Sequence, residues 1–231
     1  IAKAHTMQGY DNPVKGDLVK LTMLGIRRMH GKPQSQAAPI LKDDLIVMLS
    51  HIPDSIKGKR DRALLMLGFC GALRRSELVA VRVEDIELTQ QGLILTIPKS
   101  KTDQFGQGRK IAIPKASGRI CPVQAVTEWL SCLGVDKGEV FRSVSKGGII
   151  STSSLSDRAV ADIIKHYVKK IGFNPVRYSG HSLRSGFVTS AAQLGISSWI
   201  IRKQTGHTSD NMLARYIRDS DLFKNNAASM F

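Results

Sequence analysis

Four parts of the chain carry side chains suited to bind or attack a phosphate group. In GALRRSEL, Arg74 follows an apolar, helix-like run and Glu77 lies three residues further on. A carboxylate at this helical spacing can orient the planar arginine fork toward a phosphate. In GHSLRSGF, His181 and Arg184 have the same spacing at a predicted helix start, where backbone N–H groups also favour an anion. A surface Arg–Glu pair and a capping segment with a satisfied histidine are the respective alternatives.

The other two parts supply a candidate nucleophile and a candidate acid. Tyr216 lies nine residues after His207 in GHTSDNMLARYI, where Thr208 or Ser209 can cap a helix. A free tyrosine has a pKa of about 10, so a nucleophilic one needs a base and positive charge around it. Lys101, in the turn-rich connection KSKTDQFGQGRK, can reach a phosphate or donate a proton. A core tyrosine and a solvated lysine are the alternatives.

The order and types of these residues together resemble the tyrosine recombinase, or phage integrase, family. The matching series runs Arg74-x-x-Glu77, Lys101, His181-x-x-Arg184, Gly206-His207 and Tyr216. The resemblance covers the catalytic domain of that family, here residues 38–231. It extends to GIRRMHGKPQSQAAP, which is similar to the segment that joins the family's two domains.

The resemblance implies a reaction without metal ion, cofactor or ATP. Tyr216 would attack the scissile phosphate of double-stranded DNA and form a 3′-phosphotyrosyl bond, which retains the phosphodiester energy. Arg74 and Arg184 would hold the nonbridging oxygens as negative charge develops on them. Lys101 would protonate the leaving 5′-oxygen.

The remaining matched residues have supporting roles by the same resemblance. His207 would donate a hydrogen bond to the phosphate, and His181 would take the tyrosine proton or hold the phosphate. Glu77 would support the arginines from behind rather than transfer a proton. The resemblance also implies a monomer when free and a homotetramer on DNA, in which the tail SDLFKNNAASMF docks on a neighbouring subunit.

The charge balance points to a polyanionic partner. Lys and Arg total 34 against 19 acidic residues, a net charge of +15. Such an excess costs self-repulsion that nucleic acid would relieve. No apolar run approaches the length of a membrane span. Three unpatterned cysteines, Cys70, Cys121 and Cys132, indicate reduced thiols rather than a zinc site, so we expect a cytoplasmic protein. The family resemblance implies a bacterial or phage origin.

The spacing of apolar residues and the positions of turn residues predict a mainly α fold with one small three-stranded antiparallel β-sheet, an α+β class. The N-terminal part has a helical pattern with leucines at spacing three, followed by a linker rich in Pro and small polar residues. By the resemblance, residues 1–37 would be the end of the family's N-terminal core-binding domain plus this linker. Residues 38–231 are expected to form the catalytic domain. Its predicted helices span residues 41–52, 57–83 and 121–134, with β-rich runs over 85–114. After a Gly/Ser-rich loop at 145–154, further helices are broken near Gly172, Gly180, Gly195 and Gly206.

Three functions are candidates for this chain. The first is site-specific DNA recombination or integration by strand cutting and rejoining. A type IB topoisomerase would share the chemistry but would relax supercoiled plasmid without sequence preference. A non-catalytic DNA-binding regulator would explain the charge but not the matched phosphate-binding groups and the tyrosine.

Overall fold

The computed structural model describes residues 1–231 except 32–36, 99–107, 118–119, 208, 211–212 and 214–231. The chain divides into two compact units, Ile1–Gln36 and Ala37–Phe231. The first unit contains α1 (Ala2–Met7), a 3₁₀ turn η1 (Pro13–Lys15) and α2 (Asp17–His30). None of the residues of α2 is buried, and its leucines at spacing three, Leu18, Leu21 and Leu24, are exposed. The helix predicted there is present, and its apolar stripe has no cover within the described part of this unit.

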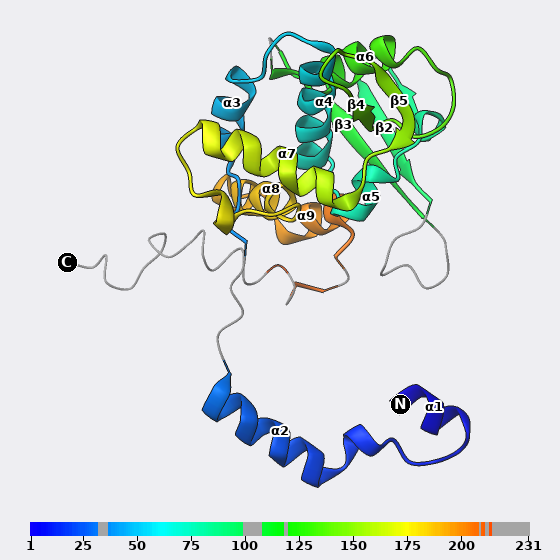
Figure 1. Ribbon diagram of the computed structural model, residues 1–231, viewed down its shortest axis with the longest axis vertical. Helices are drawn as coiled ribbons and strands as arrows, with labels where there is room; N and C mark the ends of the chain where they lie inside the picture. Colours follow the sequence, from blue (N-terminus) through cyan, green and yellow to red (C-terminus); the bar gives the residue numbers. More distant parts are fainter. Residues whose placement is uncertain (32–36, 99–107, 118–119, 208, 211–212, 214–231) are drawn as a thin grey trace, which may run out of the picture. The chain divides into compact units, whose positions relative to one another are not determined.

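The second unit has a mainly helical order with two small antiparallel sheets (Figure 1). In chain order its elements are α3 (Lys42–Ser50), α4 (Ile56–Cys70), α5 (Arg75–Val79), η2 (Val83–Asp85), β1 (Ile86–Leu88), β2 (Gly92–Ile97), β3 (Arg109–Pro114), α6 (Pro122–Leu133), β4 (Arg142–Val144), β5 (Ile150–Ser154), α7 (Asp157–Lys170), η4 (Pro175–Arg177), α8 (Ser182–Gln193) and α9 (Ser198–Thr205). The predicted α+β class is confirmed.

Helix α4 forms the centre of the second unit. Its N-cap is Ser55, whose side chain accepts a hydrogen bond from the backbone N–H of Gly58, and ten of the helix residues are buried. It packs against α6 and α8, and Figure 1 shows it with the strands on one side and α3 on the other. A helix buried this fully has no amphipathic stripe, which explains its near-continuous apolar run ALLMLGFC.

The three-stranded sheet follows the alternation expected of a half-buried antiparallel meander. Strand β2 lies between β1 and β3, and the β2–β3 register runs from Gly92 opposite Pro114 to Ile97 opposite Arg109. Alternate residues of these two strands, among them Leu93, Leu95 and Ile111, are buried in the core. The connection at the Ile97–Arg109 end holds Lys101, which lies outside the described residues.

Two local predictions were wrong. The segment 145–154 was expected to be a loop, but its second half forms β5, which pairs with β4 across a turn that contains Gly148 at φ +82°. The single helix expected over residues 57–83 is interrupted, because α4 ends at Cys70 and the separate helix α5 ends at Val79. Beyond it the backbone pairs with residues 138–140, because the N–H of Val140 donates to Val81 and that of Val83 to Gly138. The β-branched valines favour this extended pairing over another helical turn.

The segment before α3 ties the start of this unit to α8. The N–H of Ile40 donates to the carbonyl of Ser182 at 3.0 Å, and Ile40 is fully buried. Gly186 allows this close approach, because a Cβ there would lie 1.7 Å from the Ile40 carbonyl oxygen. The first turn of α8, which carries Arg184, is therefore held in place by the backbone of the segment before α3.

Candidate active site

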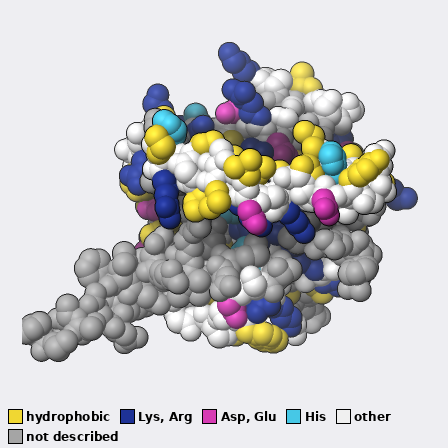
Figure 2. Space-filling model, turned by 90° about the horizontal axis from the view of Figure 1, so that it is seen from below, with side chains coloured by type: hydrophobic (Ala, Val, Ile, Leu, Met, Phe, Trp, Pro, Cys, Tyr) yellow, Lys and Arg dark blue, Asp and Glu magenta, His cyan; other side chains and the backbone are white. Residues whose placement is uncertain are grey.

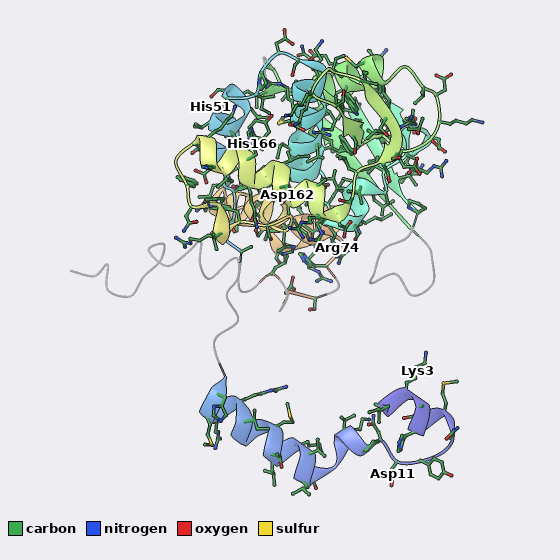
Figure 3. All side chains as sticks on the ribbon, viewed as in Figure 1. Lys3, Asp11, His51, Arg74, Asp162 and His166 are labelled. Carbon is green, nitrogen blue, oxygen red and sulfur yellow. The ribbon has the colours of Figure 1, made fainter. Side chains whose placement is uncertain are left out.

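Arg74, which is labelled in Figure 3, lies at the junction between α4 and α5, at the edge of the second unit. It is the N-cap of α5, and its backbone N–H donates to Oε2 of Glu77 at 2.9 Å. Its Nη1 donates to Oε1 of the same carboxylate at 2.7 Å. The pair expected from the sequence is present, but the Glu77 side chain is only 4% exposed. The alternative of a solvated surface pair is therefore wrong.

A second arginine, Arg109, holds the other side of Glu77. Its Nη2 and Nη1 donate to Oε2 and Oε1 at 3.0 and 3.3 Å. Burial acts to raise the pKa of the Glu77 carboxyl, but the backbone N–H of Arg74, the charge of Arg109 and the side-chain hydrogen bonds of both arginines hold it below its ordinary value. Glu77 is thus an ionised acceptor between two cations. Sequence reasoning missed Arg109, because an arginine at the start of a strand carries no signal in so basic a chain.

Arg184, in the first turn of α8, is buried with 1% exposure. Its Nη1 donates to the carbonyl of Ala72 at 2.6 Å, and its Nη2 lies 3.0 Å from Nε2 of His207. Ala72 follows the end of α4 in the left-handed conformation, at φ +47°. Its N–H bonds to Phe69 and the N–H of Leu73 bonds to Gly68, the Schellman pattern of a helix end. This helix end turns one carbonyl toward the arginine.

His207 follows Gly206, which ends α9 in the left-handed conformation at φ +69°. The hydroxyl of Thr205 donates to the carbonyl of Ile201 at 2.8 Å and lies 2.8 Å from Nδ1 of His207. The hydroxyl proton is therefore committed, so Nδ1 carries the ring proton and Nε2 accepts from Arg184. Burial, then the charges of Arg184 and Arg74, lower the pKa of His207 to about 3. The ring is neutral, with both nitrogens engaged.

His181 is the N-cap of α8 and is exposed. Desolvation, followed by the positive charges of Arg184 and Arg74, lowers the pKa of its imidazole. A neutral imidazole can accept a proton, so the site favours the base form near neutral pH. The side chain of His181 makes no capping hydrogen bond at this helix start, so it does not act as the capping side chain considered from the sequence.

The structure thus brings together five of the predicted site residues, Arg74, Glu77, His181, Arg184 and His207, from three separate parts of the chain. Lys101 and Tyr216 lie outside the described residues, as do Thr208 and the tail 220–231. Leu213 is the described residue nearest to Tyr216 in the sequence. Its side chain is fully buried against Val188, Ala191 and Ile201 of α8 and α9.

The assembled groups can bind one anion. Arg74 and Arg184 offer permanent positive charge, and both histidines are neutral with lowered pKa values. Within the described residues, no group of three or more His, Cys, Asp or Glu is placed to hold a metal ion. The same part of the chain contains no helix long and apolar enough to cross a membrane. Lys and Arg side chains are also spread over the face shown in Figure 2, between exposed hydrophobic ones.

Comparison with known proteins gives the class of the chain. Residues 40–222 match the phage integrase family. The chain is 41% identical over 232 residues to the integrase/recombinase xerD homolog of Selenomonas ruminantium, covering 98% of this chain and 68% of that protein. It is 28% identical to the recombinase cre of Escherichia phage P1, covering 94% and 67%. The chain belongs to the phage integrase family, as its motifs predicted.

Solved structures show the same fold. The XerH site-specific recombinase in a post-cleavage complex with its palindromic difH substrate superposes with a TM-score of 0.67 at 18% identity, over 86% of this chain and 55% of that one. A lambda integrase dimer bound to a COC′ core site gives a TM-score of 0.58 at 18% identity, over 97% and 64%. The chain therefore spans about two thirds of the length of these two curated relatives and a smaller share of the two solved chains.

Proposed function

We propose that this chain is the catalytic part of a site-specific recombinase that cuts and rejoins double-stranded DNA through a 3′-phosphotyrosyl intermediate, in DNA integration or recombination. The observation that carries the proposal is the convergence of Arg74, Arg184, His181 and His207 on one site. Family membership and the DNA-bound recombinases among its structural neighbours support it.

In the proposed mechanism, Arg74 and Arg184 bind the two nonbridging oxygens of the scissile phosphate. Their charge is worth most as the pentacoordinate transition state gathers negative charge. Tyr216 attacks the phosphorus, and the bond to the 5′-oxygen breaks. His181 takes the tyrosine proton or binds the phosphate, and Lys101 supplies a proton to the leaving oxygen.

His207 needs a rearrangement to donate to that phosphate. Its Nε2 accepts from Arg184 and its Nδ1 faces Thr205, so neither nitrogen has a proton to offer an incoming anion. A bound phosphate would attract the Arg184 Nη2 proton away from Nε2 and would favour protonation of the ring. We therefore assign the donor role of His207 to the DNA-bound state.

The assembly is part of the proposal. Double-stranded DNA is the partner, bound by a homotetramer whose subunits are monomers when free, in the cytoplasm of a bacterium or phage host. Residues 1–37 are proposed to be the end of a core-binding domain plus linker, and 38–231 the catalytic domain. The uncovered apolar stripe of α2 fits a helix that packs within a larger domain.

A suicide substrate tests this function. A duplex with the cleavage site, nicked close to the cut so that the 5′-hydroxyl strand diffuses away, traps the covalent intermediate. The parent protein should form an adduct, and Tyr216→Phe, which keeps the ring, should form none. Adduct in Tyr216→Phe would disprove the nucleophile, and no adduct with the parent would favour a binding regulator. Relaxation of any supercoiled plasmid would favour the topoisomerase.

A further inference from the structure

Arg109 is a charged residue at the site to which the proposed mechanism gives no role. It is the first residue of β3, directly after the connection that holds Lys101. Its side chain is 16% exposed, and both terminal nitrogens donate to the two oxygens of Glu77. Its Nε is buried and has no hydrogen-bond partner among the described residues. The contact to Glu77 is therefore end-on and fixes the plane of the guanidinium.

The same guanidinium lies against the end of α9. A Cβ at Gly206 would come within 2.8 Å of Nη1 and 3.1 Å of Cζ of Arg109. Gly206 directly precedes His207, so Arg109 contacts the turn that presents this histidine. One side chain thus joins the base of the β2–β3 connection, α5 and the end of α9.

The shared carboxylate links Arg109 to Arg74. Glu77 accepts from Arg74 through Oε1 and from Arg109 through both oxygens. Without Arg109, one buried carboxylate would have Arg74 as its only cation in this chain of contacts. Arg74 would then be drawn to Glu77, and its positive charge would be largely neutralised. With Arg109 present, the trio keeps one net positive charge for an anion.

We propose that Arg109 is a positioning residue: by holding Glu77 from the side opposite Arg74, it leaves the Arg74 guanidinium oriented and electrostatically available to the scissile phosphate. The inference rests on the proposed function. A third phosphate-binding arginine is the competing role, because Arg109 is also close enough for its charge to lower the pKa of His207.

A double-mutant cycle separates the two roles. The variants are Arg109→Gln, Glu77→Gln and the double variant. Arg158→Gln is the control, because the Arg158 side chain is 91% exposed and its ion pair with Asp162 is long, at 3.9 Å. The readouts are the adduct rate at saturating DNA on the nicked suicide duplex, the DNA dissociation constant and the melting temperature. The adduct rate of folded, saturated protein is not changed by a loss of stability alone.

Positioning through Glu77 predicts coupled losses. Arg109→Gln should slow adduct formation by about 10–100-fold, the same range as for the loss of side chains that orient metal ligands. The double variant should be no slower than the slower single variant. Arg109→Lys keeps the charge but loses the two-point contact, so it should lose most of the rate with little change in the dissociation constant. It also tests the role if Arg109→Gln does not fold.

Three results would overturn the inference. Losses that multiply in the double variant would make Arg109 a direct phosphate ligand, as would a dissociation constant that weakens with the rate. A parent-like rate for Arg109→Lys would show that charge alone suffices. If the parent forms no adduct, the proposed function fails first. The melting temperatures of the same variants then still test the contact on which the inference depends, because additive shifts for Arg109 and Glu77 would refute their coupling.

Discussion

Tyr167 shows what the fold does with a helical tyrosine that belongs to the core. Its hydroxyl donates to Oδ2 of the buried Asp61 at 2.9 Å, and Asp61 is paired with the buried Arg60. Burial, then the charge of Asp61, raises the pKa of Tyr167, so it resists ionisation. A nucleophilic tyrosine needs the reverse surroundings. The proposed site supplies them to Tyr216 as arginines, with their one buried carboxylate already neutralised.

At the same scale, Lys101 can be tested as the acid by changing the leaving atom. Lys101→Ala should slow cleavage by about 10²–10⁴-fold, the usual worth of a general acid. A 5′-bridging sulfur needs no acid, because a thiolate is a far better leaving group than an alkoxide. We expect the variant to cleave the sulfur substrate at nearly the parent rate, measured by adduct formation.

Arg74→Ala and Arg184→Ala are the controls for this experiment, since phosphate-binding arginines remain necessary on either substrate. Both should stay slow with sulfur. If Lys101→Ala is equally impaired on the two substrates, then Lys101 only binds phosphate. Lys99 or a histidine would then be the next candidate for the acid.

His207 predicts an acid-sensitive stability. The unfolded chain takes up this proton near the ordinary pKa of 6.5, whereas the folded site holds the pKa at about 3. Between these values the unfolded state binds more protons, so this stability is complete above the upper value and is lost as pH falls. As the pH falls from 6.5 toward about 4, the melting temperature of His207→Gln should fall less steeply than that of the parent protein.

The control for that measurement is His51→Gln, which removes an exposed imidazole at the C-cap of α3. Protonation of Glu77 also destabilises the fold in acid, because its folded pKa is lowered, but both proteins share it. Equal slopes for His207→Gln and the parent would show that His207 is not held neutral.

At the scale of elements, the site depends on where helices end. The α4 end places Ala72 in a left-handed conformation that costs a residue with a Cβ roughly 1–2 kcal/mol. The hydrogen bond from Arg184, at 2.6 Å, and the two backbone bonds of the helix end offset this cost. The end of α9 uses glycine instead, because the space over Gly206 is taken by Arg109. Two helix ends therefore aim the groups that flank Arg184.

Gly186 gives a prediction about the packing of α8. An added methyl would clash with the Ile40 backbone, at 1.7 Å from its carbonyl oxygen and 2.5 Å from its carbonyl carbon. Gly186→Ala should lower the free energy of unfolding by about 1–3 kcal/mol, as overpacking does. The melting temperature should fall by about 2–4 °C per kcal/mol. Adduct formation should fall as well, because α8 carries His181 and Arg184.

Gly25→Ala is the matched control, since Gly25 is also helical and has no atom within 4 Å of the added methyl. Helix propensity favours alanine over glycine there by about 1 kcal/mol, so its helix should not be weakened. An unchanged melting temperature for Gly186→Ala would mean that the segment before α3 does not pack on α8 as described.

At the scale of the whole molecule, the charge of +15 predicts binding that depends steeply on salt. Each phosphate contact adds about 0.9 to the magnitude of the slope of log affinity against log salt. Titrations of Tyr216→Phe with duplex DNA, which avoid cleavage, should give a slope that corresponds to several phosphates. The affinity should be weak for this chain alone, because most of the proposed core-binding domain lies outside it. A flat salt response would argue against DNA as the partner.

The sequence by itself determined the chemistry-bearing groups and most of the elements. Arg74 with Glu77, and His181 with Arg184, are each three residues apart, so one helical turn places each pair and local spacing suffices to predict it. The helices at 122–133, 157–170 and 182–193 follow from apolar periodicity and from glycine breaks. The strand β5 and the end of α5 were missed, because both are set by pairing with distant backbone rather than by local preference.

Only the tertiary structure decided how the groups meet. Arg184 finds the Ala72 carbonyl across 112 positions, and Arg109 finds Glu77 across 32. Neither contact has a local spacing, so no pattern in the sequence could show it. The protonation pattern of His207 was also beyond the sequence, since it depends on a committed Thr205 proton and a buried guanidinium. Rigid elements from four parts of the chain bring these arginines and histidines together into one electropositive site. Because the interior has a low dielectric constant, the electrostatic interactions of these groups are stronger there than in water.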